Sequence, residues 1–145
     1  MNWIICFRYT NNIGPWRLFT FHRKQFGHVF AVRYDSNLGL WVRFECASQR
    51  FRFEILGEEE SDFLAYDMLE NCICVETEVQ ESCIYAPRWL YCVSFVKHIL
   101  GMNKPWILTP YQLYCELIKK DHRIIFVKDE GDEDGIHVCP QPTGT

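Results

Sequence analysis

Cys92 is the residue best suited to chemistry, because the sequence places it near the start of a helix. The segment from about Trp89 to Leu100 follows Pro87 and ends at Gly101, which is typical of a helix with a C-terminal glycine. Backbone N–H groups in a first helical turn favour the thiolate form of a cysteine, which attacks carbonyl carbons. The same N–H groups can bind the oxyanion that forms in such an attack.

A nucleophilic thiol needs an imidazole from elsewhere in the chain, and His28 is the best placed histidine. It stands at the start of a predicted strand in which His28, Phe30 and Val32 share a face. We expect this to be the apolar face, against which the helix that carries Cys92 packs. Cys92 and His28 then form a pair of nucleophile and general base.

Both residues also have ordinary structural explanations. Cys92, Phe95, Val96 and Ile99 recur at helical spacing, so Cys92 equally fits the first core residue of an amphipathic helix. His28 fits a histidine at a strand end whose ring nitrogens are satisfied by hydrogen bonds. Spacing alone leaves both interpretations open.

Eight cysteines raise the possibility of disulfides or of a metal site. Disulfide frameworks are typical of small secreted chains that cannot bury a core, and 145 residues with 48% hydrophobic residues are enough for a core. For zinc, alternation puts Cys72 and Cys74 on one strand face, but no second pair follows. We therefore predict no metal and no cofactor, and buried thiols at most of the remaining positions, Cys6, Cys46, Cys83, Cys115 and Cys139.

The elements around these residues predict an α+β fold, an antiparallel β-sheet meander with helices packed on one face. Hydrophobic patterns and turn residues predict strands over residues 3–10, 16–22, 27–34, 40–46, 50–56, 71–80 and 124–127. Helices are predicted after Gly57, over 89–100, and over 109–120 with Thr109 as N-cap. One face of the meander is expected to be solvated. We assign residues 1–128 to a single α+β domain and 129–145 to an acidic polar C-terminal tail.

Composition and charge exclude several classes of function. No apolar run approaches the ~20 residues that span a bilayer, and residues 1–8 lack the features of a signal peptide, so we expect no membrane and a reducing, intracellular setting. Residues 1–56 carry eight Lys/Arg and three Asp/Glu, whereas residues 57–145 carry seven and sixteen. The arginines of the first part alternate with apolar residues instead of forming a concentrated patch, so nucleic acid is not an expected partner.

Two segments resemble the circularly permuted papain-like (NlpC-type) cysteine hydrolases, a group that includes relatives of lecithin–retinol acyltransferase. In that group a Gly-His strand precedes a helix that carries the cysteine. Residues 27–32 resemble the histidine strand, and residues 91–101 resemble the nucleophile helix. Residues 106–114 look like the corresponding part of short uncharacterised proteins of tailed bacteriophages. The resemblance covers about residues 27–120.

The resemblance implies hydrolysis or transfer at an amide, ester or thioester through an acyl-enzyme on Cys92, with His28 as base and then acid. In the family a third polar residue orients the imidazole, and Glu45 is the best match by position. Period-two alternation places Glu45 on the opposite face from His28 unless a bulge intervenes. His22 is the alternative orienting residue.

Two functions therefore remain in view. The first is a phage-encoded cysteine hydrolase of the peptidase or amidase type, acting in the host cytoplasm or the virion on a peptide, amide or ester. The second is a non-enzymatic virion structural or host-interaction protein that retains the papain-like scaffold and binds other virion proteins. A tail ordered throughout would favour the second, because a neighbouring chain would have to hold it.

Overall fold

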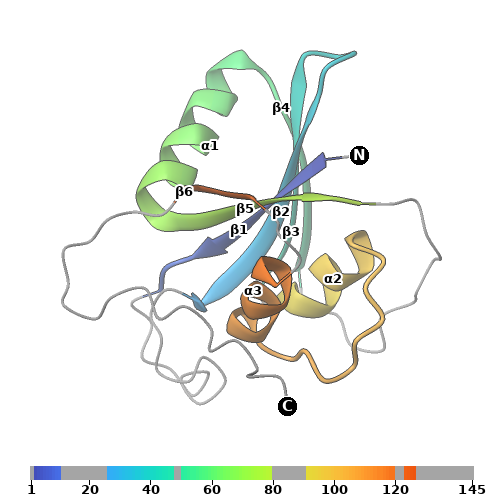
Figure 1. The fold of residues 1–145 in the computed structure, drawn as a ribbon. Helices are drawn as coiled ribbons and strands as arrows, with labels where there is room; N and C mark the ends of the chain where they lie inside the picture. The colour runs from blue at the N-terminus through green and yellow to red at the C-terminus, as the bar shows by residue number, and fades with distance from the viewer. Residues whose placement is uncertain (1, 11–25, 48–49, 80–90, 120–122, 127–145) are drawn as a thin grey trace.

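A six-stranded antiparallel sheet with three helices forms the described part of the chain (Figure 1). The computed structural model describes residues 2–10, 26–47, 50–79, 91–119 and 123–126. The strand order across the sheet is β4-β3-β2-β1-β5-β6. The elements are β1 (Asn2–Arg8), β2 (His28–Asp35), β3 (Leu40–Ala47), β4 (Arg50–Leu56), α1 (Glu58–Asn71), β5 (Cys72–Glu78), α2 (Cys92–Ile99), α3 (Pro110–Ile118) and β6 (Arg123–Phe126). The predicted α+β class and its meander are confirmed.

The helices cover both faces of the sheet, so the prediction that they pack on one face is wrong. One face packs β-strand residues such as Phe30 and Val32 against Leu64 and Met68 of α1. The other face forms the larger core, in which the strands contact both α2 and α3. Figure 1 shows α1 on one side of the sheet and the two shorter helices on the other. The central strands have apolar side chains on both faces. A strand that is covered on both faces shows no clear alternation, so its sequence does not indicate that helices pack on each side.

The prediction that one face of the meander is solvated is wrong, because exposure differs between strands and not between faces. Residues Val29 to Val32 of β2 are buried on both faces, whereas β4 at the sheet edge is exposed on both. Its apolar side chains Phe51, Phe53 and Ile55 are 57%, 50% and 59% exposed. Burial therefore follows the position of a strand in the sheet and not its alternation pattern alone.

Local sequence signals place the helix ends. The backbone N–H of Gly57 donates to the Glu60 carboxylate at the start of α1, 3.1 Å away. Thr109 and Gln112 exchange side-chain and backbone hydrogen bonds at the start of α3, as the predicted N-cap requires. In the described residues α2 begins at Cys92, three residues later than predicted. Cys92 is therefore the first residue of its helix.

Several predictions concern residues outside the described ranges. They are the strand over 16–22 with His22, the cysteines Cys83 and Cys139, and the tail over 129–145. The single-domain assignment of residues 1–128 stays a prediction. None of the helices in the described part of the chain has the length and apolar character that crossing a bilayer demands.

Candidate active site

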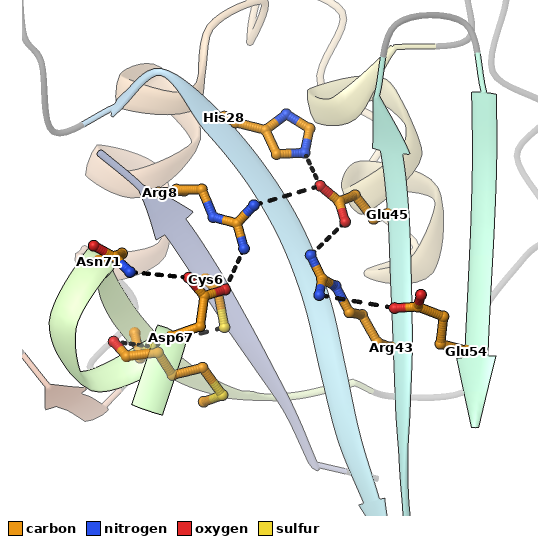
Figure 2. Close-up of polar contacts among 10 residues, drawn as sticks. Cys6, Arg8, His28, Arg43, Glu45, Glu54, Asp67 and Asn71 are labelled. Atoms are coloured by element: carbon orange, nitrogen blue, oxygen red, sulfur yellow. Dashed lines mark hydrogen bonds and ion pairs between the residues drawn. The ribbon is translucent and has the colours of Figure 1, made fainter. Parts of the chain in front are cut away.

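The structure brings Cys92, His28 and Glu45 together, although they come from three elements. His28 is the first residue of β2, Glu45 lies near the end of β3, and Cys92 opens α2. The Nε2 atom of His28 is 3.0 Å from Oε1 of Glu45 (Figure 2). The thiol of Cys92 lies close enough to His28 to raise the pKa of the imidazole. The imidazole therefore stands between a carboxylate and a thiol.

Glu45 shares a face of the sheet with His28, so its predicted place on the opposite face is wrong. Phe30 lies directly opposite Glu45 in the β2–β3 register, and Phe30 and His28 share a face by alternation. The prediction had aligned the apolar residues of β3 with His28. In the structure they point with Val29 and Ala31 toward α2 instead. No bulge is needed to bring Glu45 to the imidazole.

The predicted orientation of His28 toward the face that packs on α2 is also wrong. Val29 and Ala31 supply that face, whereas His28 alternates to the other side. His28 still reaches Cys92 because it is the terminal residue of β2, where the end of the strand no longer separates the two faces. The contact therefore depends on where β2 begins.

Gly27 fixes that beginning. Its N–H donates to the Arg8 carbonyl at 3.1 Å, which continues the pairing of β2 with β1. A Cβ at position 27 would stand 1.9 Å from Cγ2 of Thr10, far closer than two carbon atoms can approach. The glycine before His28 is thus required by the close approach of the neighbouring chain segment.

Glu45 is held as a carboxylate by three cationic groups. Arg43 donates a hydrogen bond to its Oε2 atom, and an Arg8 nitrogen lies 3.9 Å from Oε1 (Figure 2). Burial works against the charge of Glu45, but His28, Arg43 and Arg8 outweigh it and lower the pKa of this carboxyl to about 2. Glu45 is therefore a fixed negative charge beside the imidazole at any physiological pH.

The imidazole of His28 is held in its charged form. Burial opposes the charge and is the largest single effect, but contacts first with Cys92 and then with Glu45 raise the pKa of His28 to about 9. Oε1 of Glu45 lies off the direction of the ring N–H, so this contact acts chiefly between charges. At neutral pH His28 is an imidazolium, able to donate a proton.

Cys92 differs in burial from the other free cysteines of the described residues. It is partly exposed at the margin of the larger core, whereas Cys6, Cys46, Cys72 and Cys74 are buried. The first turn of α2 is fixed by Ser94, whose hydroxyl accepts from the Tyr91 N–H at 3.1 Å and donates to the Tyr91 carbonyl at 2.9 Å. The N–H groups of Cys92 and Val93 have no acceptor within the helix and point toward the thiol end of α2.

Two arginines extend the site toward α1. Arg8 bridges Glu45 to Asp67 of α1, and Asn71 donates to Asp67 at 3.1 Å (Figure 2). The guanidinium groups of Arg8 and Arg43 lie 5.0 and 4.7 Å from the ring centroid of buried Phe30. Arg8 approaches the same oxygen of Glu45 as His28, and Arg43 the other, so both carboxylate oxygens are held.

The remaining cysteines divide into a buried group and one disulfide. Cys6, Cys72 and Cys74 are fully buried under α1. Burial is the first cause that raises the pKa of Cys72 to about 12 and that of Cys6 well above its usual value. No group of three or more potential metal ligands occurs among the described residues. Cys115 is disulfide-bonded, which corrects the prediction of a buried thiol at this position.

Sequence reasoning did not find Arg8, Arg43 or the role of Ser94. Arg8 lies at the end of a predicted strand, and Arg43 lies in an alternating pattern typical of a solvated face. Neither position indicates a contact with Glu45. Ser94 carried no prediction of its own within the predicted helix. The spacing from Tyr91 to Ser94 is the signal that would have revealed it, because an N3 side chain can bond the N-cap N–H.

Comparison of the chain with protein-family models, with curated proteins and with solved structures gave no match in any of the three. The argument for function therefore rests on the geometry and charges of the site.

Proposed function

We propose that the chain is a cysteine hydrolase of the permuted papain-like class, with Cys92 as nucleophile, His28 as general acid and base, and Glu45 as the residue that orients and charges the imidazole. Its substrates are amides, esters or thioesters, and the resemblance points to a phage source. The observation that carries the proposal is the contact of His28 with both Cys92 and Glu45 at a partly exposed helix start.

The reaction follows from the charges of the three groups. The Cys92 thiolate attacks the substrate carbonyl, and the N–H groups of the first turn of α2 bind the resulting oxyanion. The His28 imidazolium gives its proton to the leaving amine or alkoxide as the bond to the carbonyl carbon breaks. Neutral His28 then takes a proton from water, the hydroxide displaces Cys92 from the thioester, and His28 is an imidazolium again.

The Arg8–Arg43 arrangement supports an orienting role for Glu45. A carboxylate that His28 alone held would compete for the proton of the imidazolium. With the pKa of Glu45 at about 2, that proton stays on the ring until the leaving group takes it. The arginines therefore act through Glu45 and need not touch the substrate.

The rate at which iodoacetamide alkylates Cys92, measured against pH on the peptide that carries this residue, tests the proposal. A thiolate–imidazolium pair gives rapid alkylation below pH 7 in the native chain. His28→Ala shifts the reaction to the range of an ordinary thiol, near pH 8.5. Circular dichroism and a second variant, His28→Gln, separate loss of the pair from loss of the fold. Equal pH profiles for the native chain and both variants would refute the hydrolase.

One observation favours the second candidate, a virion or host-interaction protein. The outer side of α1 exposes Phe63, Tyr66 and Leu69 to 78%, 66% and 43%, on a helix with six acidic residues and no Lys or Arg. The argument from an ordered tail does not apply, since residues 129–145 lie outside the described ranges. Immunoblots of purified particles test this candidate. It is supported where Phe63→Ser with Tyr66→Ser prevents incorporation and Cys92→Ala does not.

A further inference from the structure

An aromatic surface adjoins the thiol on the side of the sheet that packs on α2. Phe95 of α2 contacts Phe51 of β4 and Phe44 of β3, with ring centroids 4.7 and 6.4 Å apart, and Phe44 contacts Phe53 at 4.8 Å. Ile55 continues the same face of β4, because it lies opposite Val42 in the β3–β4 register. We call Phe44, Phe51, Phe53, Ile55 and Phe95 the aromatic platform.

The platform is left open by the fold. Phe51, Phe53 and Ile55 are each at least half exposed, although they are large apolar side chains on one face of one strand. Helix α2 covers the neighbouring strands β2 and β3, and its Phe95 contacts Phe51. Contiguous apolar surface of this kind is uncommon on a soluble domain and marks places where a ligand binds.

The platform is continuous with the nucleophile. Cys92 and Phe95 are three residues apart on α2, so their Cβ atoms are neighbours on the helix surface, about 5–6 Å apart. Cys46 lies opposite Phe51 in the register and is close enough to Cys92 for a thiolate there to raise its pKa, after burial, the larger cause. Phe95 and Phe51 are therefore the platform residues nearest to Cys92.

We propose that the aromatic platform selects substrates with a large apolar, preferably aromatic, side chain next to the bond that Cys92 attacks. This inference rests on the proposed hydrolase function and names its substrate class, an apolar peptide or amide. Phe51 and Phe53 are the residues that determine specificity, since their rings offer open faces. Offset or edge-on contact with an aromatic side chain and removal of its surface from water supply the preference.

Two alkylating reagents test the platform on the full chain. N-(2-phenylethyl)iodoacetamide carries an aromatic group, and N-(2-hydroxyethyl)iodoacetamide is its polar counterpart. We expect Cys92 of the native chain to react about tenfold faster with the aromatic reagent after correction for the ratio seen with free cysteine. Phe51→Ser with Phe53→Ser brings the ratio of the two rates close to one.

A matched control uses aromatic residues of α1, which packs on the face of the sheet opposite to α2. Phe63 and Tyr66 are more exposed than Phe51 and Phe53, and Phe63→Ser with Tyr66→Ser should retain the tenfold preference. A native preference near one, or a preference that survives loss of Phe51 and Phe53, overturns the proposal. Dimers in sedimentation that the double β4 variant abolishes would also overturn it, because a second copy would then cover the platform.

A titration that does not need the thiol separates failure of the platform from failure of the hydrolase. In Cys92→Ser, N-acetylphenylalaninamide should shift the NMR signals of Phe51 and Phe53, and N-acetylglycinamide should not. Shifts with both amides or with neither count against the platform. Shifts with the aromatic amide alone, in a chain whose alkylation does not depend on His28, retain the platform and reject the hydrolase.

Discussion

Cys92 and the Cys6–Cys72–Cys74 cluster show how differently one fold can treat the same side chain. The cluster lies under α1, fully buried, with the Cys6 and Cys74 sulfur atoms 3.7 Å apart. Cys92 lies at the open end of α2, partly exposed and joined to an imidazolium. In the cluster, burial outweighs the effect of Arg8 on Cys72 and of Arg43 on Cys6, so these thiols are packing groups. Cys92 is partly exposed, beside an imidazolium and at the first turn of a helix, and is therefore equipped as a nucleophile.

The comparison also shows that the number and closeness of cysteines do not indicate which thiol is reactive. The sulfur atoms of Cys6 and Cys74 are neighbours, yet burial raises the pKa of Cys6 and Cys72 and keeps these thiols protonated. Reactivity is set by solvent and charge around each sulfur, and the chain supplies both only at Cys92 among its described free thiols.

Exchange of a single cysteine in each region should give the largest contrast. Cys92→Ser should lower the rate of acyl transfer to the chain by at least ~10³-fold without loss of stability, because it removes the nucleophile. Cys74→Ser should leave that rate unchanged and lower the free energy of unfolding by about 1–3 kcal/mol, because it buries a hydroxyl among apolar groups. Mass spectrometry of the acylated chain and urea denaturation measure the two effects. The same outcome at both positions would contradict the assignment of Cys92 as a nucleophile and Cys74 as a packing residue.

Glu45→Gln tests whether the carboxylate of Glu45 keeps the imidazole beside Cys92 positively charged. Loss of the negative charge should lower the pKa of His28 from about 9, so the alkaline limb of the activity profile moves to lower pH. We expect the rate to fall about 10²-fold. The His28 ring-proton signals in NMR, followed against pH, measure the shift directly. An unchanged titration would mean that Cys92 alone charges the imidazole.

Two glycine substitutions provide a matched pair. Gly27→Ala places a Cβ against Thr10 and should destabilise the chain by about 1–3 kcal/mol and displace His28, so alkylation of Cys92 near pH 6 slows. Gly39→Ala meets no atom within 4 Å but has a φ of +67°, and should cost about 1 kcal/mol without affecting Cys92. Thermal unfolding and alkylation rates of both variants distinguish damage to the site from damage to the fold.

The pH dependence of stability should reflect the charged region alone. The pKa of His28 is about 9 in the fold and near 6.5 unfolded, so its contribution is complete below pH 6.5 and is lost as pH rises through 9. The pKa of Glu45 is about 2 in the fold and near 4.5 unfolded, so its contribution is complete above pH 4.5 and is lost as pH falls through 2.

Both contributions are therefore complete between pH 4.5 and 6.5, and the free energy of unfolding should decline on either side by about 1–3 kcal/mol. Urea denaturation at a series of pH values measures this profile. In His28→Gln the alkaline decline should disappear up to the range where other groups titrate. Its persistence would assign the decline to another residue.

The sequence could predict the elements but not which face each strand presents. Turn residues such as Gly39 and caps such as Thr109 are local signals, and the elements that they bound occur where expected. Facing depends on register, and in β2 both faces are apolar because α1 and α2 cover them. Glu45 was therefore assigned to the correct position in the chain and to the wrong side of the sheet.

The candidate site was predictable to the extent that its residues carry local signals. Cys92 has a helix start and His28 a preceding glycine. Arg8 and Arg43 carry none, because an arginine in a strand is typical of a solvated face and only the fold turns it toward Glu45. A single sequence therefore does not reveal charged residues, such as these arginines, that act on the site through another residue.

The strand order has a consequence for how the chain acquires its site. β1 pairs with β5 over a register that joins Asn2 to Glu78, whereas β2, β3 and β4 pair through short turns. During synthesis the hairpin that joins His28 to Glu45 emerges complete before α2 is made. Among the strand pairs, β1 and β5 join the most distant segments, so we expect their closure to be slow. We also expect the His28–Glu45 pair to form before Cys92 joins it, because α2 packs on β2 and β3.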